Sequence, residues 1–136
     1  MGKKIVLDTN ILISAFGWEG NPKEIFRKIL NKEFELIISY KQIQELQRVL
    51  NYPKFKFTNE QKLRFMNVIL EIATLVETHN GIDIIKEDPS DNIILESALE
   101  NNVEFIITGD EHLLKLKSYG KIKIVTASEF LQLFNY

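Results

Sequence analysis

The chain has 136 residues, 45% of them hydrophobic and 26% charged, with a net charge of −2. These values are typical of one globular domain, which we expect to cover residues 1–136. The absence of cysteine excludes disulfides and thiol chemistry and suits a cytoplasmic protein, and we expect no membrane span and no signal peptide.

The first half of the chain alternates between apolar strands and amphipathic helices. Residues 4–7 form a predicted buried strand, because apolar residues follow one another there, and residues 35–38 form a second. Short helices are predicted over 11–16 and after Pro22. Ser39 with Gln42, and Thr58 with Gln61, are two predicted capping boxes, and each opens a further helix.

The second half continues the alternation. Residues 74–78 are a short predicted strand, a helix opens at 88–91, and residues 105–107 form a third buried strand. Residues 121–125 alternate apolar residues with lysine, as expected of an edge strand, and Thr126 with Glu129 caps the last helix. This pattern predicts an α/β fold with a parallel sheet covered by helices on both faces.

Four acidic residues lie where these elements meet. Asp8 and Asp110 follow buried strands, Glu45 lies in the second turn of a helix, and Asp91 lies in the first turn of another. In a parallel sheet these positions share one edge, so the side chains can converge. Four carboxylates repel one another unless a cation neutralises them, and oxygen ligands alone favour Mg²⁺ or Mn²⁺. Such a cluster suits phosphodiester hydrolysis.

Each acid also has a purely structural interpretation. The two aspartates after strands can cap the next helix, and Asp91 can favour a helix N-terminus that Asp88 caps. Glu45 can pair with Arg48 on a solvated face. The joint pattern favours the metal site, because Glu45 lies at the edge of the apolar stripe of its helix rather than opposite it.

The overall charge does not identify the partner. If a metal pocket neutralises four of the 19 acidic residues, the 17 basic residues exceed the remaining acids by two. Basic and aromatic residues alternate after the helix of Glu45, and such a stretch can bind single-stranded RNA. It can equally be a loop that its aromatic residues fix to the core. The candidate RNA contacts are Arg48, Lys54 and Lys56, beside Tyr52, Phe55 and Phe57.

The order and spacing of four motifs match a known family. The chain resembles PIN domains, a metal-dependent ribonuclease fold, and within them the toxins of toxin–antitoxin systems. The resemblance extends from residue 4 to about residue 134 and implies a three-layer α/β/α fold with five parallel strands in the order 3-2-1-4-5. The matching stretches are Val6-Leu7-Asp8-Thr9-Asn10, Ser39 with Glu45-Leu46, Asp88-Pro89-Ser90-Asp91-Asn92, and Ile107-Thr108-Gly109-Asp110 with Leu113-Leu114.

The resemblance also implies a site and partners. It assigns one or two Mg²⁺ or Mn²⁺ ions to four catalytic acids and gives Asn10 and Thr108 a supporting role in the pocket. Asp88 is acidic in many relatives, and we assign it to capping. The implied partners are an RNA substrate, an antitoxin protein and a second copy of the chain, with Trp18 and Phe57 as exposed apolar contacts. The implied catalytic acids and metal ligands are Asp8, Glu45, Asp91 and Asp110.

Other function classes fit the sequence less well. A Rossmann-like phosphatase of the haloacid-dehalogenase type needs an acid where this chain has Asn10, and a receiver domain needs an acid adjoining Asp8. A non-catalytic PIN-fold module for protein binding would tolerate loss of an acid, yet all four are present. The sequence gives no reason to assign catalysis to His79 or His112, which we expect at the surface. We therefore interpret the chain as a metal-dependent endoribonuclease.

Overall fold

The computed structural model describes residues 2–79, 81, 83–85 and 88–134. The strands are β1 (Lys3–Leu7), β2 (Phe34–Ser39), β3 (Thr74–Val76), β4 (Phe105–Ile107), β5 (Ser118–Tyr119) and β6 (Ile122–Val125). The helices are α1 (Thr9–Gly17), α2 (Asn21–Leu30), α3 (Tyr40–Leu50), α4 (Asn59–Ile72), α5 (Ser90–Glu100), α6 (Glu111–Leu114) and α7 (Ala127–Phe134), with a 3₁₀ turn η1 (Pro53–Phe55).

The strands form one sheet in the order β3-β2-β1-β4-β6-β5. The first five pair in parallel, with Ile5 of the central strand β1 opposite Leu36 and Phe105. The predicted order of five parallel strands in an α/β fold is therefore confirmed. The sheet is nevertheless mixed, because β5 adds a sixth strand antiparallel to β6. Residues 121–125, which we predicted to form an edge strand, contain β6, and β6 lies between β4 and β5 instead of at the edge.

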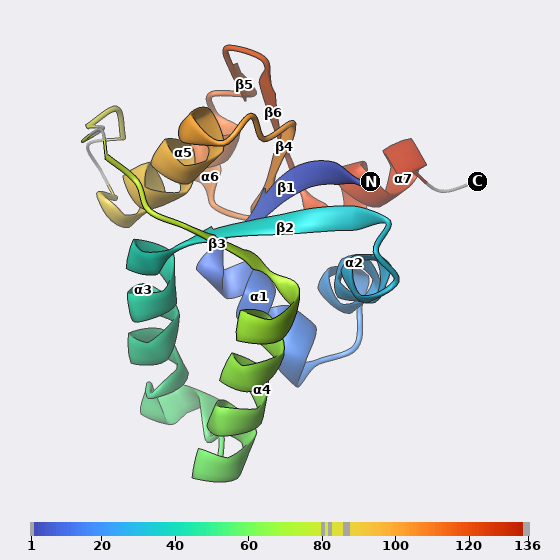
Figure 1. The fold of residues 1–136 in the computed structure, drawn as a ribbon, viewed down its shortest axis with the longest axis vertical. Helices are drawn as coiled ribbons and strands as arrows, with labels where there is room; N and C mark the ends of the chain where they lie inside the picture. The colour runs from blue at the N-terminus through green and yellow to red at the C-terminus, as the bar shows by residue number, and fades with distance from the viewer. Residues whose placement is uncertain (1, 80, 82, 86–87, 135–136) are drawn as a thin grey trace.

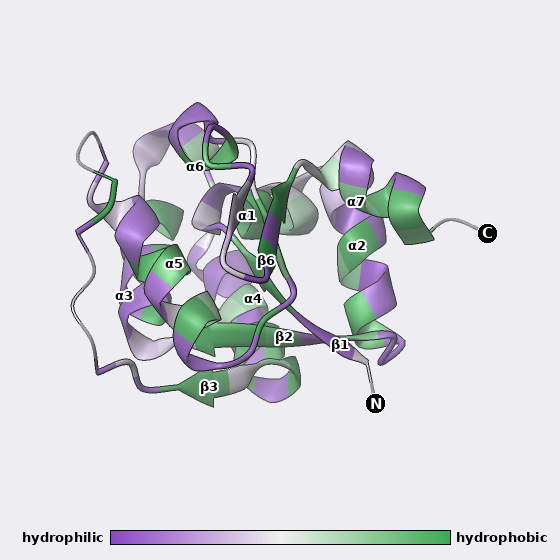
Figure 2. Cartoon of the chain, turned by 90° about the horizontal axis from the view of Figure 1, so that it is seen from above, coloured by the Kyte–Doolittle hydropathy of each residue, from purple (hydrophilic) through white to green (hydrophobic). Residues whose placement is uncertain are grey.

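Helices cover both faces of the sheet. Alternate residues of β1 point to opposite faces, so that Ile5 and Leu7 pack with α1, α2, α3, α4 and α7, while Val6 packs with α5 and α6. Figure 1 shows α5 and α6 on one side of β1 and β2, and α1, α3 and α4 on the other. Figure 2 shows β2 and β3 as largely hydrophobic, and helices such as α2, α3 and α7 that carry both hydrophobic and hydrophilic residues. No helix in the described ranges has both the length and the apolar character that a membrane span requires.

Two of the three predicted capping boxes form as expected. At the start of α4, Thr58 and Gln61 exchange side-chain and backbone hydrogen bonds of 2.8 and 3.1 Å. Thr126 and Glu129 do the same before α7, with the same two distances. Each box satisfies two backbone donors at a helix start, which fixes where the helix begins.

Candidate active site

The structure brings the four acids together in one pocket at the C-terminal edge of the parallel strands. Three of them are buried, with exposed fractions of 8% for Asp8, 8% for Glu45 and 6% for Asp91, and Asp110 is partly exposed. We call this cavity of about 50 Å³ the acid pocket. Its lining residues are Asp8, Thr9, Asn10, Glu45, Asp88, Ser90, Asp91, Ile94 and Asp110.

Asp8 is both a helix cap and a wall of the acid pocket. Its Oδ1 accepts a hydrogen bond of 2.8 Å from the backbone N–H of Ile11 at the start of α1. Its Oδ2 accepts a hydrogen bond from the hydroxyl of Thr108. Burial raises the pKa of Asp8, the hydrogen bonds oppose this rise, and the charge of Asp110 adds to it. The structural and the chemical interpretation of this residue are therefore compatible.

Thr108 connects the two aspartates that follow strands. It is fully buried, and while its hydroxyl donates to Asp8, its oxygen accepts a 3.0 Å hydrogen bond from the backbone N–H of Asp110. Asp110 in turn caps α6, because its Oδ1 accepts a 2.7 Å hydrogen bond from the backbone N–H of His112. One buried hydroxyl thus fixes the relative positions of both carboxylates.

Glu45 points into the acid pocket from α3. Its Oε1 accepts a hydrogen bond from the hydroxyl of Thr9, and its Oε2 lies 3.9 Å from a guanidinium nitrogen of Arg48. The ion pair proposed from the sequence therefore exists, but Glu45 itself is buried and does not lie on a solvated face.

The predicted capping box at the start of α3 forms only in part. Ser39 accepts a hydrogen bond of 3.1 Å from the backbone N–H of Gln42, as expected. The buried amide of Gln42, however, donates at 2.7 Å to the carbonyl of Leu7 instead of returning to Ser39. The reason is that α3 packs against the end of β1, where this carbonyl needs a donor. The bond places the helix of Glu45 beside Asp8.

Asp91 has unfavourable surroundings for a charge. Its Oδ2 is buried and has no hydrogen-bond partner among the residues that the structure describes. Burial and the negative charges of Asp110, Asp88 and Asp8 raise the pKa of Asp91 to about 8. At neutral pH this carboxyl group therefore needs either a proton or a nearby cation.

Asp88 has its own local role. Its Oδ1 accepts hydrogen bonds of 3.1 Å from the backbone N–H and 2.6 Å from the hydroxyl of Ser90. The carboxylate thus shapes the turn that leads into α5, while it also lines the acid pocket. Asp88 is not the predicted N-cap, because that position is Pro89 and has no side-chain cap hydrogen bond, and the role of Asp88 is to fix the turn before the helix.

The donors of the acid pocket suit a divalent cation. Carboxylate oxygens predominate, and the unpartnered Oδ2 of Asp91 lacks the partner that a buried polar atom normally has. One ligand atom each from Asp91, Asp110 and His112 lie within 4.8 Å of one another. His112, which we expected at the surface, is partly exposed, and its position two residues after Asp110 also brings it beside the pocket.

The candidate RNA contacts occupy the region after α3. The side chain of Arg48 is exposed. Its guanidinium group lies beside the acid pocket, 3.9 Å from Oε2 of Glu45. The ammonium group of Lys54 lies 5.1 Å from the ring centre of Phe55, and Lys56 is exposed in a left-handed conformation (φ 55°) after η1. These three cations therefore extend from the acid pocket along α3 to η1.

The phenylalanines of this region are less exposed than expected, whereas Tyr52 is exposed. Phe57 is half-buried, and its ring lies 5.4 Å from that of Phe16 and 5.7 Å from that of Phe55. The prediction of Phe57 as an exposed contact is thus wrong, because the residue packs against the core. Trp18 is exposed as predicted, with an exposed fraction of 51%, and its ring contacts Phe55 and Phe57 at one edge of this cluster.

A buried ion pair that was not predicted joins α3 and α5. Glu96 on α5 has a side chain only 4% exposed, and its Oε1 accepts a hydrogen bond of 2.8 Å from the ammonium group of the half-exposed Lys41 on α3. Glu96 lies among the inward-facing residues Ile94, Leu95 and Ala98 of the same helix. An acid at such a position indicates a buried charged partner, and this signal could have predicted the pair. The pair joins two helices that both carry acids of the pocket.

Removing the cation of this pair should destabilise the protein. We expect Lys41→Met to cost about 1–3 kcal/mol in urea unfolding, because Glu96 would keep a buried charge without its partner. The double variant Lys41→Met/Glu96→Leu should recover most of this loss. Arg64→Met removes an exposed pair with Glu60 and should change stability little. Equal losses of stability in Lys41→Met and Arg64→Met would show that the burial of Glu96 does not matter.

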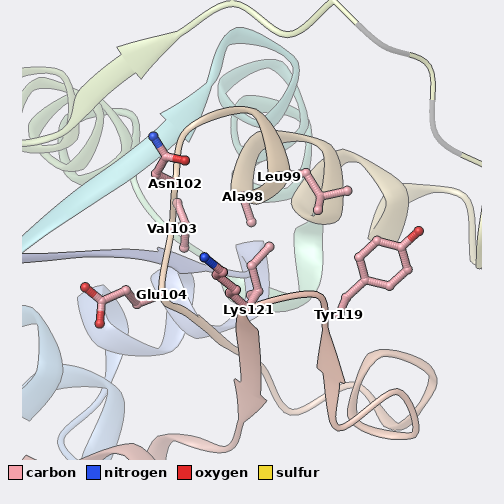
Figure 3. Close-up of a pocket in the computed structure, with 8 residues that line it drawn as sticks. Ala98, Leu99, Asn102, Val103, Glu104, Tyr119 and Lys121 are labelled. Atoms are coloured by element: carbon pink, nitrogen blue, oxygen red, sulfur yellow. The ribbon is translucent and has the colours of Figure 1, made fainter.

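A different cavity lies at the opposite edge of the sheet. It measures about 230 Å³ and is mainly apolar. Figure 3 shows that its side chains come from the end of α5, the segment before β4 and the turn before β6. It contains no cluster of acids comparable with that of the acid pocket. Its lining residues are Ala98, Leu99, Asn102, Val103, Glu104, Tyr119, Lys121 and Ile122.

The fold and the acid pocket agree with a comparison against known families. A family model described as "PIN domain" matches residues 4–112. The chain belongs to the PIN domain family, since this match covers most of its length, and the resemblance inferred from the four motifs is confirmed.

Solved structures with the same fold include two distant relatives. VapBC2 from Rickettsia felis, crystallised with a DNA fragment from its promoter, has a TM-score of 0.63 and 18% identity over 89% of this chain and 96% of that chain. PAE2754 from Pyrobaculum aerophilum has a TM-score of 0.62 and 14% identity over 98% of this chain and 91% of that chain. At such identities the similarity concerns the fold alone. No curated protein matches the sequence.

Proposed function

We propose that the protein is a Mg²⁺- or Mn²⁺-dependent endoribonuclease, formed by one PIN domain over residues 1–136 and active in the cytoplasm as the toxin of a toxin–antitoxin pair. PIN domains are generally nucleases, and the four acids of the family motif are all present in this chain. The catalytic and metal-binding residues proposed are Asp8, Glu45, Asp91 and Asp110, with Asn10 and Thr108 in support.

The state of Asp91 is the observation that carries this proposal. A buried carboxyl group with an unpartnered oxygen and a pKa raised to about 8 is unfavourable unless it binds a proton or a cation. Four further carboxylates line the same cavity, which is more negative charge than a structural role requires. A divalent cation bound there would supply Lewis acidity and a water molecule activated for attack on phosphorus.

Neighbouring residues keep the carboxylates in place without a ligand. Ile11 and Thr108 fix the two oxygens of Asp8, and Thr9 fixes one oxygen of Glu45. Because these donors come from rigid helix starts and a strand end, the carboxylates lose little conformational freedom on binding. We expect them to hold a scissile phosphate and its attacking water in a fixed orientation.

The residues of the acid pocket also favour one type of product. The described part of the pocket contains carboxylates and a single neighbouring histidine, and no pair of histidines that could move protons to and from a ribose hydroxyl. Water is therefore the expected nucleophile. Its oxygen would bond to phosphorus while the bond to the ribose 3′-oxygen breaks, which leaves a 5′-phosphate and a free 3′-hydroxyl.

A digest of single-stranded RNA tests the proposal. We expect cleavage that requires Mg²⁺ or Mn²⁺, stops in EDTA, leaves 5′-phosphates and falls at least about a hundredfold in Asp8→Asn. Fragment end groups and initial rates are the measurements, and Asp83→Asn, which changes an exposed acid outside the acid pocket, is the matched control. Cyclic 2′,3′-phosphates that persist in EDTA would show that the four acids are not the catalysts. No cleavage of any RNA would favour the protein-binding module instead.

The RNA contacts and the protein partners remain part of the same proposal. Arg48, Lys54 and Lys56 would bind phosphates, so that their replacement by methionine should raise KM and weaken its salt dependence. An antitoxin and a second copy of the chain are the proposed protein partners, with the exposed Trp18 as one contact. A small antitoxin gene beside the gene for this chain, and co-purification of both products, would support the toxin role.

A further inference from the structure

His112 is fixed beside the acid pocket by its contacts with Asp110. His112 lies in α6, two residues after Asp110, and its backbone N–H donates to Oδ1 of Asp110. This cap fixes the main chain of His112 next to the carboxylate. The imidazole Nδ1 lies 3.4 Å from the same Oδ1. The imidazole is thus held at the acid pocket by the local fold.

We propose that His112 is a nitrogen ligand of the metal ion in the acid pocket, and that this ligand makes the site prefer Mn²⁺ to Mg²⁺. The inference rests on the metal site of the proposed function, but it does not depend on RNA as the substrate.

The distances in this cluster suit one coordination sphere. One ligand atom each from Asp91, Asp110 and His112 lie within 4.8 Å of one another. Ligands placed about 2.1 Å from an octahedral ion are separated by roughly 3 Å when adjacent and by roughly 4 Å when opposite. The 3.4 Å between Nδ1 of His112 and Oδ1 of Asp110 is close to the adjacent case. Small side-chain rotations would bring all three donors onto one ion.

The atoms that face this position lack other partners. Nδ1 of His112 and Oδ2 of Asp91 are both buried, and neither has a hydrogen-bond partner in the described part of the chain. A separation of 3.4 Å is too long for a good N–H···O hydrogen bond between Nδ1 and Asp110. Buried polar atoms are normally satisfied, so two unsatisfied atoms beside the same carboxylate indicate a ligand between them.

The type of donor determines which ion is preferred. Mg²⁺ is a hard cation that favours oxygen ligands, whereas imidazole nitrogen binds first-row transition ions better. A pocket made of carboxylates alone would accept Mg²⁺ and Mn²⁺ with similar ease. One imidazole in the coordination sphere should therefore shift the preference toward Mn²⁺.

Metal titration of the whole protein without RNA tests this inference. In calorimetry with MnCl₂ and MgCl₂, we expect the wild type to bind Mn²⁺ at least about tenfold more tightly. His112→Gln should weaken Mn²⁺ binding by about tenfold or more and change Mg²⁺ binding little. His112→Asp, which replaces the nitrogen donor by oxygen, should shift the preference back toward Mg²⁺. His79→Gln alters the other histidine and should resemble the wild type.

Pulsed electron paramagnetic resonance of the Mn²⁺ complex gives a direct readout. We expect nuclear modulation from a coordinated nitrogen in the wild type and in His79→Gln, and its absence in His112→Gln. No nitrogen modulation in the wild type would overturn the inference. Equal weakening of both ions in His112→Gln would also overturn it, since His112 would then act only by positioning Asp110.

These outcomes are independent of the nuclease assay. A nitrogen-coordinated Mn²⁺ in a protein that cuts no RNA would refute the proposed function and leave the ligand assignment standing. Metal-dependent RNA cleavage with an oxygen-only Mn²⁺ site would refute the ligand and leave the function standing.

Discussion

The metal-free protein should lose stability as the pH rises from about 4 to about 8, and Asp91→Asn should remove the part of this loss that Asp91 causes. The pKa of Asp91 is raised in the folded state from 3.8 to about 8, so the folded protein binds a proton that the unfolded chain has already released. Stability from this proton is complete below the unfolded pKa and disappears as the pH passes the folded pKa. The expected change is on the order of several kcal/mol.

Urea unfolding in EDTA at several pH values measures this effect. The informative quantity is the difference in the free energy of unfolding between wild type and Asp91→Asn, because titrating groups remote from Asp91 cancel in it, and only Asp91 and the acids whose charges act on it contribute. Glu71→Gln, which neutralises an exposed acid on α4, should follow the wild type. A pH profile of Asp91→Asn that matches the wild type would mean that the carboxylates of the acid pocket do not repel one another appreciably.

Millimolar Mn²⁺ should raise the melting temperature of the wild type, and Asp8→Asn or Asp91→Asn should abolish most of the rise. An ion that binds only the folded state stabilises it by about 2.7 kcal/mol at a hundredfold excess over Kd, or roughly 10 °C for a domain of this size. The same variants should be no less stable than the wild type without metal. Asparagine can keep the cap on Ile11 that Oδ1 of Asp8 provides.

Differential scanning calorimetry with and without Mn²⁺ distinguishes the roles of the acids. Asp88→Asn is the matched comparison, because Asp88 lines the acid pocket but already binds Ser90. It should retain most of the rise. If wild type, Asp8→Asn and Asp91→Asn respond alike to Mn²⁺, the acids do not form one site. A large loss of stability in Asp8→Asn without metal would make helix capping its main role.

The sequence predicted the central elements well, because their periodicity is strong. Contiguous apolar residues marked β1, β2 and β4, and the capping boxes at Thr58 and Thr126 marked two helix starts. The short strand β5 was not predicted, since two residues cannot show a periodicity. Its pairing depends on the reversal at Gly120, where φ is 59°, and on contact with Ile122 of β6.

The residues around the acids were harder to predict than the acids themselves. Strand ends and helix starts are local features, so the edge of the sheet that carries Asp8 and Asp110 could be inferred. The roles of Gln42, Glu96 and His112 depend on contacts between elements distant in sequence or on the direction of one side chain. A capping box and a buried pairing of Gln42 have the same sequence signature. Only the packing of α3 on β1 decides between them.

The central position of β1 has a consequence for the order in which the protein is made. Among the strands of the sheet β1 leaves the ribosome first, yet its partner β4 pairs with it through Phe105 to Ile107. At about 5 to 20 residues per second, the hundred or so residues between them take on the order of 5 to 20 seconds to synthesise. One side of the nascent strand stays unpaired for that time and is open to association with other chains.

Asp110 follows β4 in the chain and is the last of the four acids to be synthesised. A nascent or prematurely terminated chain thus holds at most three of the proposed ligands. A cell that makes this protein would be exposed to the proposed nuclease activity only after translation has passed β4. Fragments that end earlier should be prone to aggregation but harmless to RNA.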